Sequence, residues 1–410
     1  PGRPVSHDYM GHFTEFDHRK VSKDLEISAW NSYPLGNLQN MQVIAREDKK
    51  LLQECYRIGD PDFQAYHHDL YRGMGRLWVM EQQPGPVNWA KYNPIPVKGA
   101  VRLWSWEAFA HDAEVVSYFR WRQAPYAQEQ MHAGLMYRDN TPAPGQEEAN
   151  QVSEELKKIE MPATEQSPIA LVHDYEACWM TELDGQTPDF HYTRLLLDFY
   201  QAVRINGGSL DIVGKNADFT GYKLVIIPSF VHFQEEDLQR VIKSGAQILA
   251  GPRTGTKTPD FQLPPELSLE GLGFQVRRVD ALPRDLPVPV EWNGVKGNFS
   301  VWREHGLTSG VSEGKSSDGM AVLTSGNQGS YLCGWPDQKL LNAIMKNQMQ
   351  LAGLDVVELP EYLRVRRRGN LLFFTNYGTQ EVSIPEVYQG ELLLGKRTLS
   401  QADISILKIN

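Results

Sequence analysis

The feature that most constrains this fold is a short apolar run, Leu77 to Met80, which ends in Glu81 and is followed by a Pro/Gly break at residues 84–86. A β-strand that is buried on both faces, as in a parallel sheet, is apolar along its whole length. The active sites of (β/α)₈ barrels lie at the carboxyl ends of such strands. Glu81 is therefore a candidate catalytic carboxylate, although a lone carboxylate at a strand end more often simply meets solvent.

Tryptophan is concentrated around this carboxylate. Five tryptophans lie within forty residues of it: Trp78, Trp89, Trp104, Trp106 and Trp121. An aromatic ring offers a large flat apolar face, which suits the C–H side of a sugar ring. A carboxylate in this company suggests a carbohydrate substrate.

The composition of the 410 residues limits the classes of partner. The net charge is −10, so there is no basic surplus to attract a nucleic acid. No apolar stretch approaches the roughly 20 residues of a membrane helix, and no membrane partner is expected. Three distant cysteines, Cys55, Cys178 and Cys333, predict buried thiols in a reducing, cytoplasmic compartment. No metal-ligand spacing is present, so no metal is expected in this chain.

The pattern of apolar runs predicts four parts. Residues 1–140 alternate strands with helices, which is the βα pattern of a parallel sheet. Residues 141–166 begin with prolines and a glycine, continue with a charged helix, and are predicted to be a linker. Residues 167–357 are predicted to be a doubly wound, three-layer α/β domain, and residues 358–410 a small antiparallel β domain.

The elements behind this division can be given as ranges. The first part has predicted strands at 5–8, 25–30, 77–80 and 115–121, with helices at 64–72 and 105–111. The third part has strands at 169–173, 210–213, 224–227 and 247–250, with helices at 192–205 and 235–243. The last part has strands at 362–366, 371–375, 381–384, 391–394 and 404–409. His67 and His68 are expected to be surface or helix-end groups. The loop 251–258 is expected to be an ordinary turn because its glycine spacing does not fit a phosphate loop.

Several motifs in order along the chain resemble the β-galactosidases of glycoside hydrolase family 42. They are Ser6-His7-Asp8-Tyr9-Met10-Gly11, Ser28-Ala29-Trp30-Asn31-Ser32-Tyr33-Pro34, Trp78-Val79-Met80-Glu81-Gln82, Val87-Asn88-Trp89, and Phe119-Arg120-Trp121-Arg122-Gln123 followed by Glu129 and His132. The resemblance implies the carboxyl-terminal half of a (β/α)₈ TIM barrel. A flavodoxin-like or amidotransferase-like α/β trimerisation domain and a small antiparallel β domain would follow it, in a homotrimer.

The same resemblance implies roles for individual residues. A retaining glycosidase needs a nucleophile and an acid/base carboxylate about 5–5.5 Å apart. By motif match, Glu81 is the nucleophile and Trp89 stacks on the sugar ring; a position in the core is the less favoured alternative for Trp89, because it follows a Pro/Gly break. Glu129 and His132 match a pair that binds galactose hydroxyls; from their spacing alone they could be neighbours on a solvated helix.

Three further residues are assigned with plain structural alternatives. Phe119 matches an aromatic residue of the sugar pocket; the alternative is a role in the core. Tyr33 is expected to hydrogen-bond the nucleophile or the sugar; the alternative is that it only packs in a turn. Arg122 is expected to orient carboxylates near Glu81.

The acid/base residue is the missing part of this assignment. In the family it is the Glu of an Asn-Glu pair, and these 410 residues contain no such pair, so we expect it upstream of Pro1. A cysteine-rich zinc site of the family is expected upstream as well. Asn31 and Asp8 stand where the family commonly has Asp and Asn, which leaves open whether α-L-arabinopyranosides are also substrates. The alternative to an enzyme that cleaves β-galactosides is a noncatalytic sugar-binding or assembly fragment.

Overall fold

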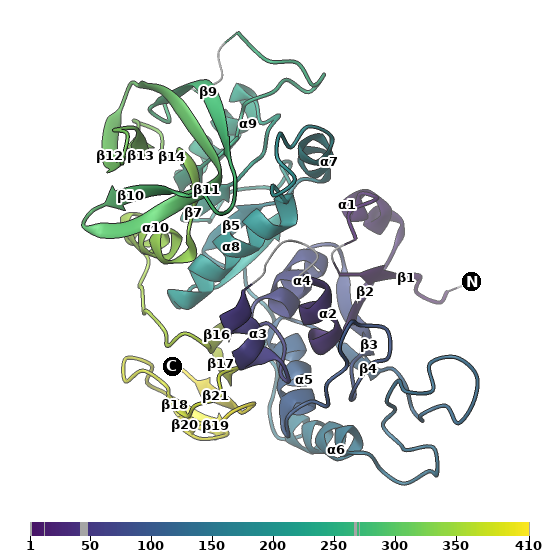
Figure 1. Cartoon of the computed structure of the whole chain (residues 1–410). Coiled ribbons are helices and arrows are strands. Elements are labelled where there is room, and N and C mark those ends of the chain that lie inside the picture. Colours follow the sequence, from purple (N-terminus) through teal and green to yellow (C-terminus); the bar gives the residue numbers. More distant parts are fainter. Residues whose placement is uncertain (1, 12, 42–47, 266–268, 270, 410) are drawn as a thin grey trace. The chain divides into compact units, whose positions relative to one another are not determined.

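A computed structural model describes residues 2–11, 13–41, 48–265, 269 and 271–409. The chain forms two compact units. The first unit comprises Pro1–Phe13, His18–Glu165 and Glu358–Asn410, and the second comprises Thr14–Asp17 and Gln166–Val357. The second unit is thus inserted, in chain order, between two parts of the first (Figure 1).

A four-stranded parallel sheet, in the order β1-β2-β3-β4, forms the centre of the first unit. Its strands are β1 (Ser6–Met10), β2 (Ile27–Ser32), β3 (Arg76–Gln82) and β4 (Val115–Tyr118). The helices that connect them are α1 (His18–Val21), the 3₁₀ turn η1 (Ser22–Asp24), α2 (Pro34–Met41), α3 (Lys49–Cys55), α4 (Phe63–Arg72) and α5 (Ala100–Ala110). Each strand is therefore followed by helix before the next parallel strand, as the sequence predicts for a barrel.

Helix α6 (Pro144–Leu156) lies in the segment that the sequence predicts as a linker. It belongs to the first unit and packs on α5. The carboxylate of Glu155 accepts hydrogen bonds from Arg102 Nε at 2.9 Å and from Trp106 Nε1 at 2.7 Å. These are buried contacts, so the structure differs here from the predicted linker.

The carboxyl-terminal strands form a four-stranded antiparallel sheet, in the order β16-β17-β21-β19, and a two-stranded sheet, β18-β20. They are β16 (Leu363–Arg368), β17 (Leu371–Asn376), β18 (Val382–Ser383), β19 (Glu391–Leu394), β20 (Thr398–Leu399) and β21 (Ile404–Lys408). They pack on α4 and α5 in the first unit. Arg364 forms a buried ion pair of 2.7 Å with Asp62 at the start of α4, and Tyr377 donates a 2.6 Å hydrogen bond to Glu107 of α5.

Helix α4 is consequently covered on both sides, which corrects the expectation for its two histidines. His67 and His68 are 2% and 1% exposed. The indole of Trp30 donates to His68 Nδ1 at 3.1 Å, and His67 Nδ1 donates to the carbonyl of Phe63 at 2.8 Å. The indole of Trp30, on strand β2, packs against both imidazoles, and this contact is not visible in the sequence of the helix itself.

The second unit is built on one eleven-stranded sheet. Its parallel part has the order β6-β5-β7-β8-β14. These strands are β5 (Ile169–Val172), β6 (Leu210–Val213), β7 (Leu224–Ile227), β8 (Gln247–Ala250) and β14 (Ser330–Leu332). Numbered along the chain, this order is 2-1-3-4-5, which is the doubly wound arrangement of flavodoxin-like folds. The helices are α7 (Tyr175–Leu183), α8 (Tyr192–Ile205), α9 (Glu235–Lys243) and α10 (Gln338–Leu351).

An antiparallel extension continues this sheet beyond β14, and the sequence analysis did not predict it. It consists of β9 (Phe274–Leu282), β10 (Val288–Trp292), β11 (Val295–Thr308), β12 (Val311–Ser316), β13 (Ala321–Ser325) and β15 (Gly334–Pro336). Asn293 and Gly294, both with positive φ, form the tight turn between β10 and β11. Asn-Gly between two strand-forming runs is the strongest short-range hairpin signal, and it could have revealed this extension.

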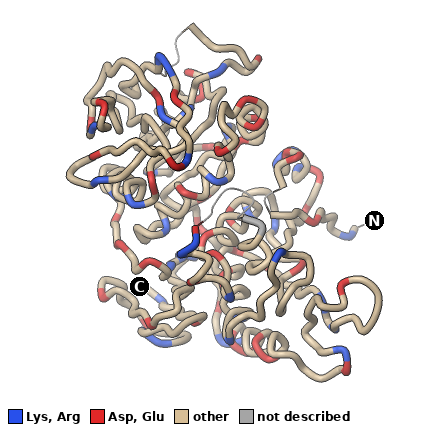
Figure 2. Tube along the Cα trace, in the orientation of Figure 1, with Lys and Arg blue, Asp and Glu red and all other residues tan. Residues whose placement is uncertain are grey.

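The expected elements of the parallel part are otherwise confirmed, since β6, β7, β8, α8 and α9 have the predicted ends. The free thiols of Cys55, Cys178 and Cys333 are all buried, as predicted. In the described part of the chain, no helix combines the length and apolarity needed to cross a bilayer. Acidic and basic side chains are interspersed along both units (Figure 2).

Candidate active site

The carboxyl ends of β1, β2 and β3 bring three polar residues together in the first unit. Asn31 is in register with Met10 of β1 on one side and with Glu81 of β3 on the other. Asp8 lies two residues before Met10 on β1 and accepts a hydrogen bond from the Asn31 side chain. Because parallel strands end at the same edge of a sheet, Asp8, Asn31 and Glu81 share one polar site at the position expected for a barrel active site.

Tyr33 joins the end of β2 to the end of β3. Its phenol donates a hydrogen bond of 2.5 Å to Glu81 Oε2. Pro34 begins α2 directly after Tyr33, and Gln83 Oε1 accepts from the backbone N–H of Leu35 at 3.0 Å, so the strand ends are tied together at this turn. Burial, together with the hydrogen bond to Glu81, raises the pKa of Tyr33 well above its usual range, so the phenol remains a donor.

Asp8 is a member of this site that the sequence analysis noted only as a departure from the family. Burial raises the pKa of its carboxyl, the nearby Glu81 charge raises it further, and the hydrogen bond with Asn31 opposes both. The site therefore places two carboxyl groups close enough to influence each other. Its position at the end of a predicted strand, like that of Glu81, was the available signal.

Aromatic rings form one wall around Tyr33. The ring of Trp89 meets Tyr33 edge to face, with centroids 5.4 Å apart, and remains 42% exposed. His132 meets Tyr33 at 5.7 Å and Phe119 at 5.2 Å, both nearly perpendicular. The structure thus brings Tyr33, Trp89, Phe119 and His132 together, and Trp89 keeps ring surface free to pack against a ligand.

His132 is poised as a neutral hydrogen-bonding group. Its Nδ1 lies 3.1 Å from the carbonyl oxygen of Ala133, which can only accept, so Nδ1 carries the proton. Nε2 is buried and has no hydrogen-bond partner in the described structure. Burial lowers the pKa of His132, although Glu129 partly opposes this. The imidazole therefore offers one acceptor nitrogen toward the site.

Glu129 forms an ion pair with Arg120, and its φ of 58° is a left-handed conformation. The Glu129 charge also acts on Tyr33 and on His132. This links Glu129 to the same cluster and places it in a loop, not on the solvated helix of the alternative interpretation.

Arg122 does not reach this cluster, which corrects its expected role. It is exposed and donates a hydrogen bond of 2.8 Å to Asn140 Oδ1. The arginine that contacts a site carboxylate is Arg120, two positions earlier. In a regular strand residues two apart point to the same side, but β4 ends at Tyr118, so this rule does not hold for Arg120 and Arg122.

The loop at residues 251–258, in the second unit, is occupied by its own structural contacts. The Arg253 guanidinium lies against the rings of Phe190 and Trp302, 4.6 and 4.2 Å from their centroids. Lys257 forms an ion pair of 2.8 Å with Asp184. Both basic side chains are thus already engaged, in keeping with the ordinary turn that the glycine spacing predicts.

Comparison with known proteins adds to this geometry. A family model described as β-galactosidase, of the glycoside hydrolase 42 type, matches residues 1–159, and a model described as the β-galactosidase trimerisation domain matches residues 167–354. The chain is 43% identical to a β-galactosidase of Thermus thermophilus, over 99% of this chain and 63% of that protein. It is 36% identical to a β-galactosidase of Halorubrum lacusprofundi, over 93% of this chain and 58% of that protein.

The fold also agrees with solved structures. The crystal structure of the β-galactosidase from the psychrophilic Marinomonas ef1 matches with a TM-score of 0.93 and 41% identity, over 100% of this chain and 64% of that one. The predicted fold class, a portion of a (β/α)₈ barrel followed by an α/β trimerisation domain and a small β domain, is confirmed. The chain spans slightly less than two thirds of the length of these relatives.

Proposed function

This chain belongs to glycoside hydrolase family 42, and we propose on that basis that it forms part of a β-galactosidase that releases terminal nonreducing β-D-galactose with retention of configuration. The observation that carries the proposal is the hydrogen bond between Tyr33 and Glu81 at the carboxyl ends of parallel strands. A carboxylate held by one directed donor at that edge is well placed to act as a nucleophile.

In the proposed reaction, one Glu81 oxygen attacks the anomeric carbon while the glycosidic C–O bond breaks. The leaving oxygen takes a proton from a carboxylic acid, and a covalent galactosyl-enzyme forms. Water, deprotonated by the same acid/base group, then attacks the anomeric carbon and frees Glu81. Tyr33 fixes one oxygen of Glu81 and leaves the other free to attack.

We assign the acid/base role to a residue outside these 410. The family's Asn-Glu pair does not occur in the sequence, and the relatives are longer than this chain. Asp8 is the other carboxyl group that interacts with Glu81, but it stands where the family commonly has Asn.

The sugar would lie between Glu81 and the aromatic wall. Trp89 would cover the C–H face of galactose, with Phe119 lining the same pocket. Glu129 would accept hydroxyl protons, and the unpartnered Nε2 of His132 would accept another. Arg120 would hold the Glu129 carboxylate in position through their ion pair.

The proposal includes a homotrimer in the cytoplasm. The match of residues 167–354 to a trimerisation domain supports the oligomer. The three free, buried thiols fit a reducing compartment.

The test is hydrolysis of a chromogenic β-galactoside by the enzyme made from its full coding sequence, with Glu81→Gln. We expect kcat to fall roughly 10⁴-fold or more, because the nucleophile is lost. Glu114→Gln is the matched control, since Glu114 lies next to the amino end of β4 and pairs with Arg76. A 2-deoxy-2-fluoro-galactoside should label the peptide that contains Glu81, and a label on another carboxylate would refute the assignment.

A further inference from the structure

A cluster in the second unit lies where doubly wound sheets hold ligands. Strand β5 is flanked by β6 on one side and by β7 on the other, so successive connections leave it in opposite directions. Ligands of such folds bind outside the carboxyl ends of the strands at this switch point. Asp174 follows the end of β5 by two residues, and His232 follows the end of β7 by five.

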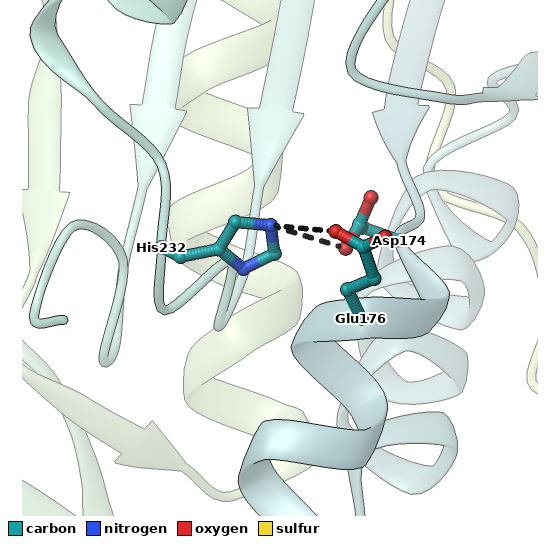
Figure 3. Close-up of side chains that lie close together, drawn as sticks. All are labelled: Asp174, Glu176 and His232. Atoms are coloured by element: carbon teal, nitrogen blue, oxygen red, sulfur yellow. Dashed lines mark ion pairs between the residues drawn. The ribbon is translucent and has the colours of Figure 1, made fainter. Parts of the chain in front are cut away.

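Three side chains converge at this point: Asp174 and Glu176 at the start of α7, and His232 from the segment after β7 (Figure 3). His232 Nε2 lies 3.6 Å from Asp174 Oδ1 and 3.7 Å from Glu176 Oε2. One ligand atom from each residue lies within 4.8 Å of the other two. These separations are too long for hydrogen bonds, whose N···O distances are about 2.7–3.2 Å.

The buried imidazole of His232 independently indicates a ligand at this place. Its side chain is 2% exposed, and neither Nδ1 nor Nε2 has a hydrogen-bond partner in the described structure. Buried polar atoms are almost always paired, because leaving one unpaired costs free energy of desolvation. The ring nevertheless points directly at two carboxylates (Figure 3).

The local charges favour ligation over a simple ion pair. Burial lowers the pKa of His232, against the opposing effect of Asp174, so the imidazole keeps the free lone pair that a metal needs. Burial raises the pKa of Asp174, whereas the hydrogen bond of 2.8 Å that it accepts from the Ala177 N–H and the nearby His232 oppose this rise. Asp174 and Glu176 both lie at the amino end of α7, where the helix dipole attracts negative charge. Lys215 Nζ lies 4.0 Å from Glu176 Oε2.

We propose that Asp174, Glu176 and His232 bind one divalent transition-metal ion, with Zn²⁺ as the representative. Zinc takes imidazole nitrogen and carboxylate oxygen at about 2.0–2.2 Å, so donors around a tetrahedral ion lie about 3.4 Å apart. The observed 3.6 and 3.7 Å from Nε2 to the two carboxylates need to shrink by only a few tenths of an ångström. The imidazole disfavours Mg²⁺ and Ca²⁺, which prefer oxygen ligands.

Such an ion would join the turn after β5 to the segment after β7, and its fourth position would be left to water or to an exogenous ligand. The sequence analysis expected no metal here because Asp174 and Glu176 are far from His232 along the chain. Folding of the parallel sheet supplies the spacing that no linear motif shows. The site is separate from the proposed galactosidase site, and its test does not depend on galactosidase activity.

The test is calorimetric titration of Zn²⁺ into the full protein after removal of metals with a chelator, for wild type, His232→Gln and Glu176→Gln. We expect both variants to bind one equivalent less than wild type, or to bind it at least about 100-fold more weakly. Zinc bound elsewhere in the protein contributes equally to wild type and to the variants, so it does not affect the difference in bound equivalents. Glu176 has a 43% exposed side chain, so Glu176→Gln tests the site without disturbing the core.

His305→Gln is the matched control. His305 Nε2 also lies 3.6 Å from a carboxylate, Asp280, but that carboxylate is already paired with Arg303. The control should bind as wild type does, and Zn²⁺ should raise the melting temperatures of wild type and of His305→Gln by more than those of the two site variants. Equal stoichiometry and affinity in all four proteins would overturn the proposal.

Discussion

The phenol of Tyr33 donates a hydrogen bond of 2.5 Å to Oε2 of Glu81, and the two residues come from the ends of neighbouring parallel strands. The position of the Glu81 carboxylate is therefore set by a turn between β2 and α2 as well as by its own strand. Trp89 and His132 pack against the same tyrosine ring. One buried side chain thus links the proposed nucleophile to the proposed sugar pocket.

Replacement of this tyrosine by Tyr33→Phe should lower kcat for a β-galactoside about 10- to 150-fold. A hydrogen bond to a charged group contributes about 1.5–3 kcal/mol, and that free energy is lost from the position of the nucleophile. Steady-state kinetics measure the effect. Tyr118→Phe is the control, since Tyr118 ends β4 and its hydroxyl lies 2.8 Å from Ser105, away from Glu81. Equal kcat values for the two variants would remove Tyr33 from the mechanism.

The ring of Trp89 can be moved by a substitution at another residue, Gly36. A Cβ added at Gly36 would lie 2.3 Å from Cη2 of Trp89, so Gly36→Ala must push the ring aside. We expect Gly36→Ala and Trp89→Ala to raise KM about 10-fold each, the equivalent of about 1.4 kcal/mol of lost stacking. Tyr92→Ala, in the same loop and 56% exposed, should leave KM unchanged. An unchanged KM in Gly36→Ala would count against stacking on Trp89.

The buried ion pair between Arg364 and Asp62 should be a large contributor to stability. Both side chains are 1% exposed, and Arg364→Met would leave the Asp62 carboxylate buried without its cation. Breaking such a pair costs about 3–5 kcal/mol. Urea unfolding should show this decrease, whereas Lys50→Met, which breaks an exposed pair with Glu361, should not. A similar free energy of unfolding in both variants would contradict the prediction.

Glu304 should make the second unit less stable as the pH rises. Burial raises the pKa of Glu304 from 4.5 to about 7, although Tyr331 and the Arg253 N–H donate to it. Between these values the native state holds a proton that the unfolded state releases, so the free energy of unfolding falls with increasing pH, by at most about 1.4 kcal/mol per unit.

The measurement is the free energy of unfolding at intervals from pH 4 to pH 8. In Glu304→Gln the free energy of unfolding should not show this decrease between pH 4.5 and about 7. The difference in free energy of unfolding between the variant and wild type should therefore shift in favour of the variant as the pH rises through that range. Glu291→Gln, an exposed change on β10, controls for the loss of one negative charge. Parallel curves for wild type and Glu304→Gln would show that the carboxyl is not protonated in the native state.

The local sequence pattern was sufficient to predict the parallel strands. Residues 224–227 and 248–250 are apolar and buried, as expected for strands of a parallel sheet whose two faces are covered, so the continuous apolar run marks the strand. In the antiparallel strands β9 to β12, charged residues interrupt the apolar pattern, as in β9, where Arg277 and Arg278 are exposed. Their pairing depends on neighbours far along the chain, which a local pattern does not contain.

The candidate active site shows the same difference between residues in local motifs and residues whose positions depend on distant parts of the chain. Glu81, Tyr33 and Trp89 belong to short motifs, and the structure brings them together as expected. The position of Arg122 depends on the path of a loop from residue 119 to residue 142, and there the expectation failed. The burial of His67 and His68 involves Trp30 of strand β2, a contact that the sequence pattern of the helix does not contain.

The insertion of the second unit within the first has a consequence for biosynthesis. Asp62, Glu107 and Arg102 leave the ribosome early, but their partners Arg364, Tyr377 and Asp403 follow only after the whole of residues 166–357 has been made. The inserted unit can fold while helices α4 and α5 are still exposed on one side. Domains generally fold as units during translation, so a nascent chain that stalls before residue 358 would present those uncovered helices to chaperones and proteases.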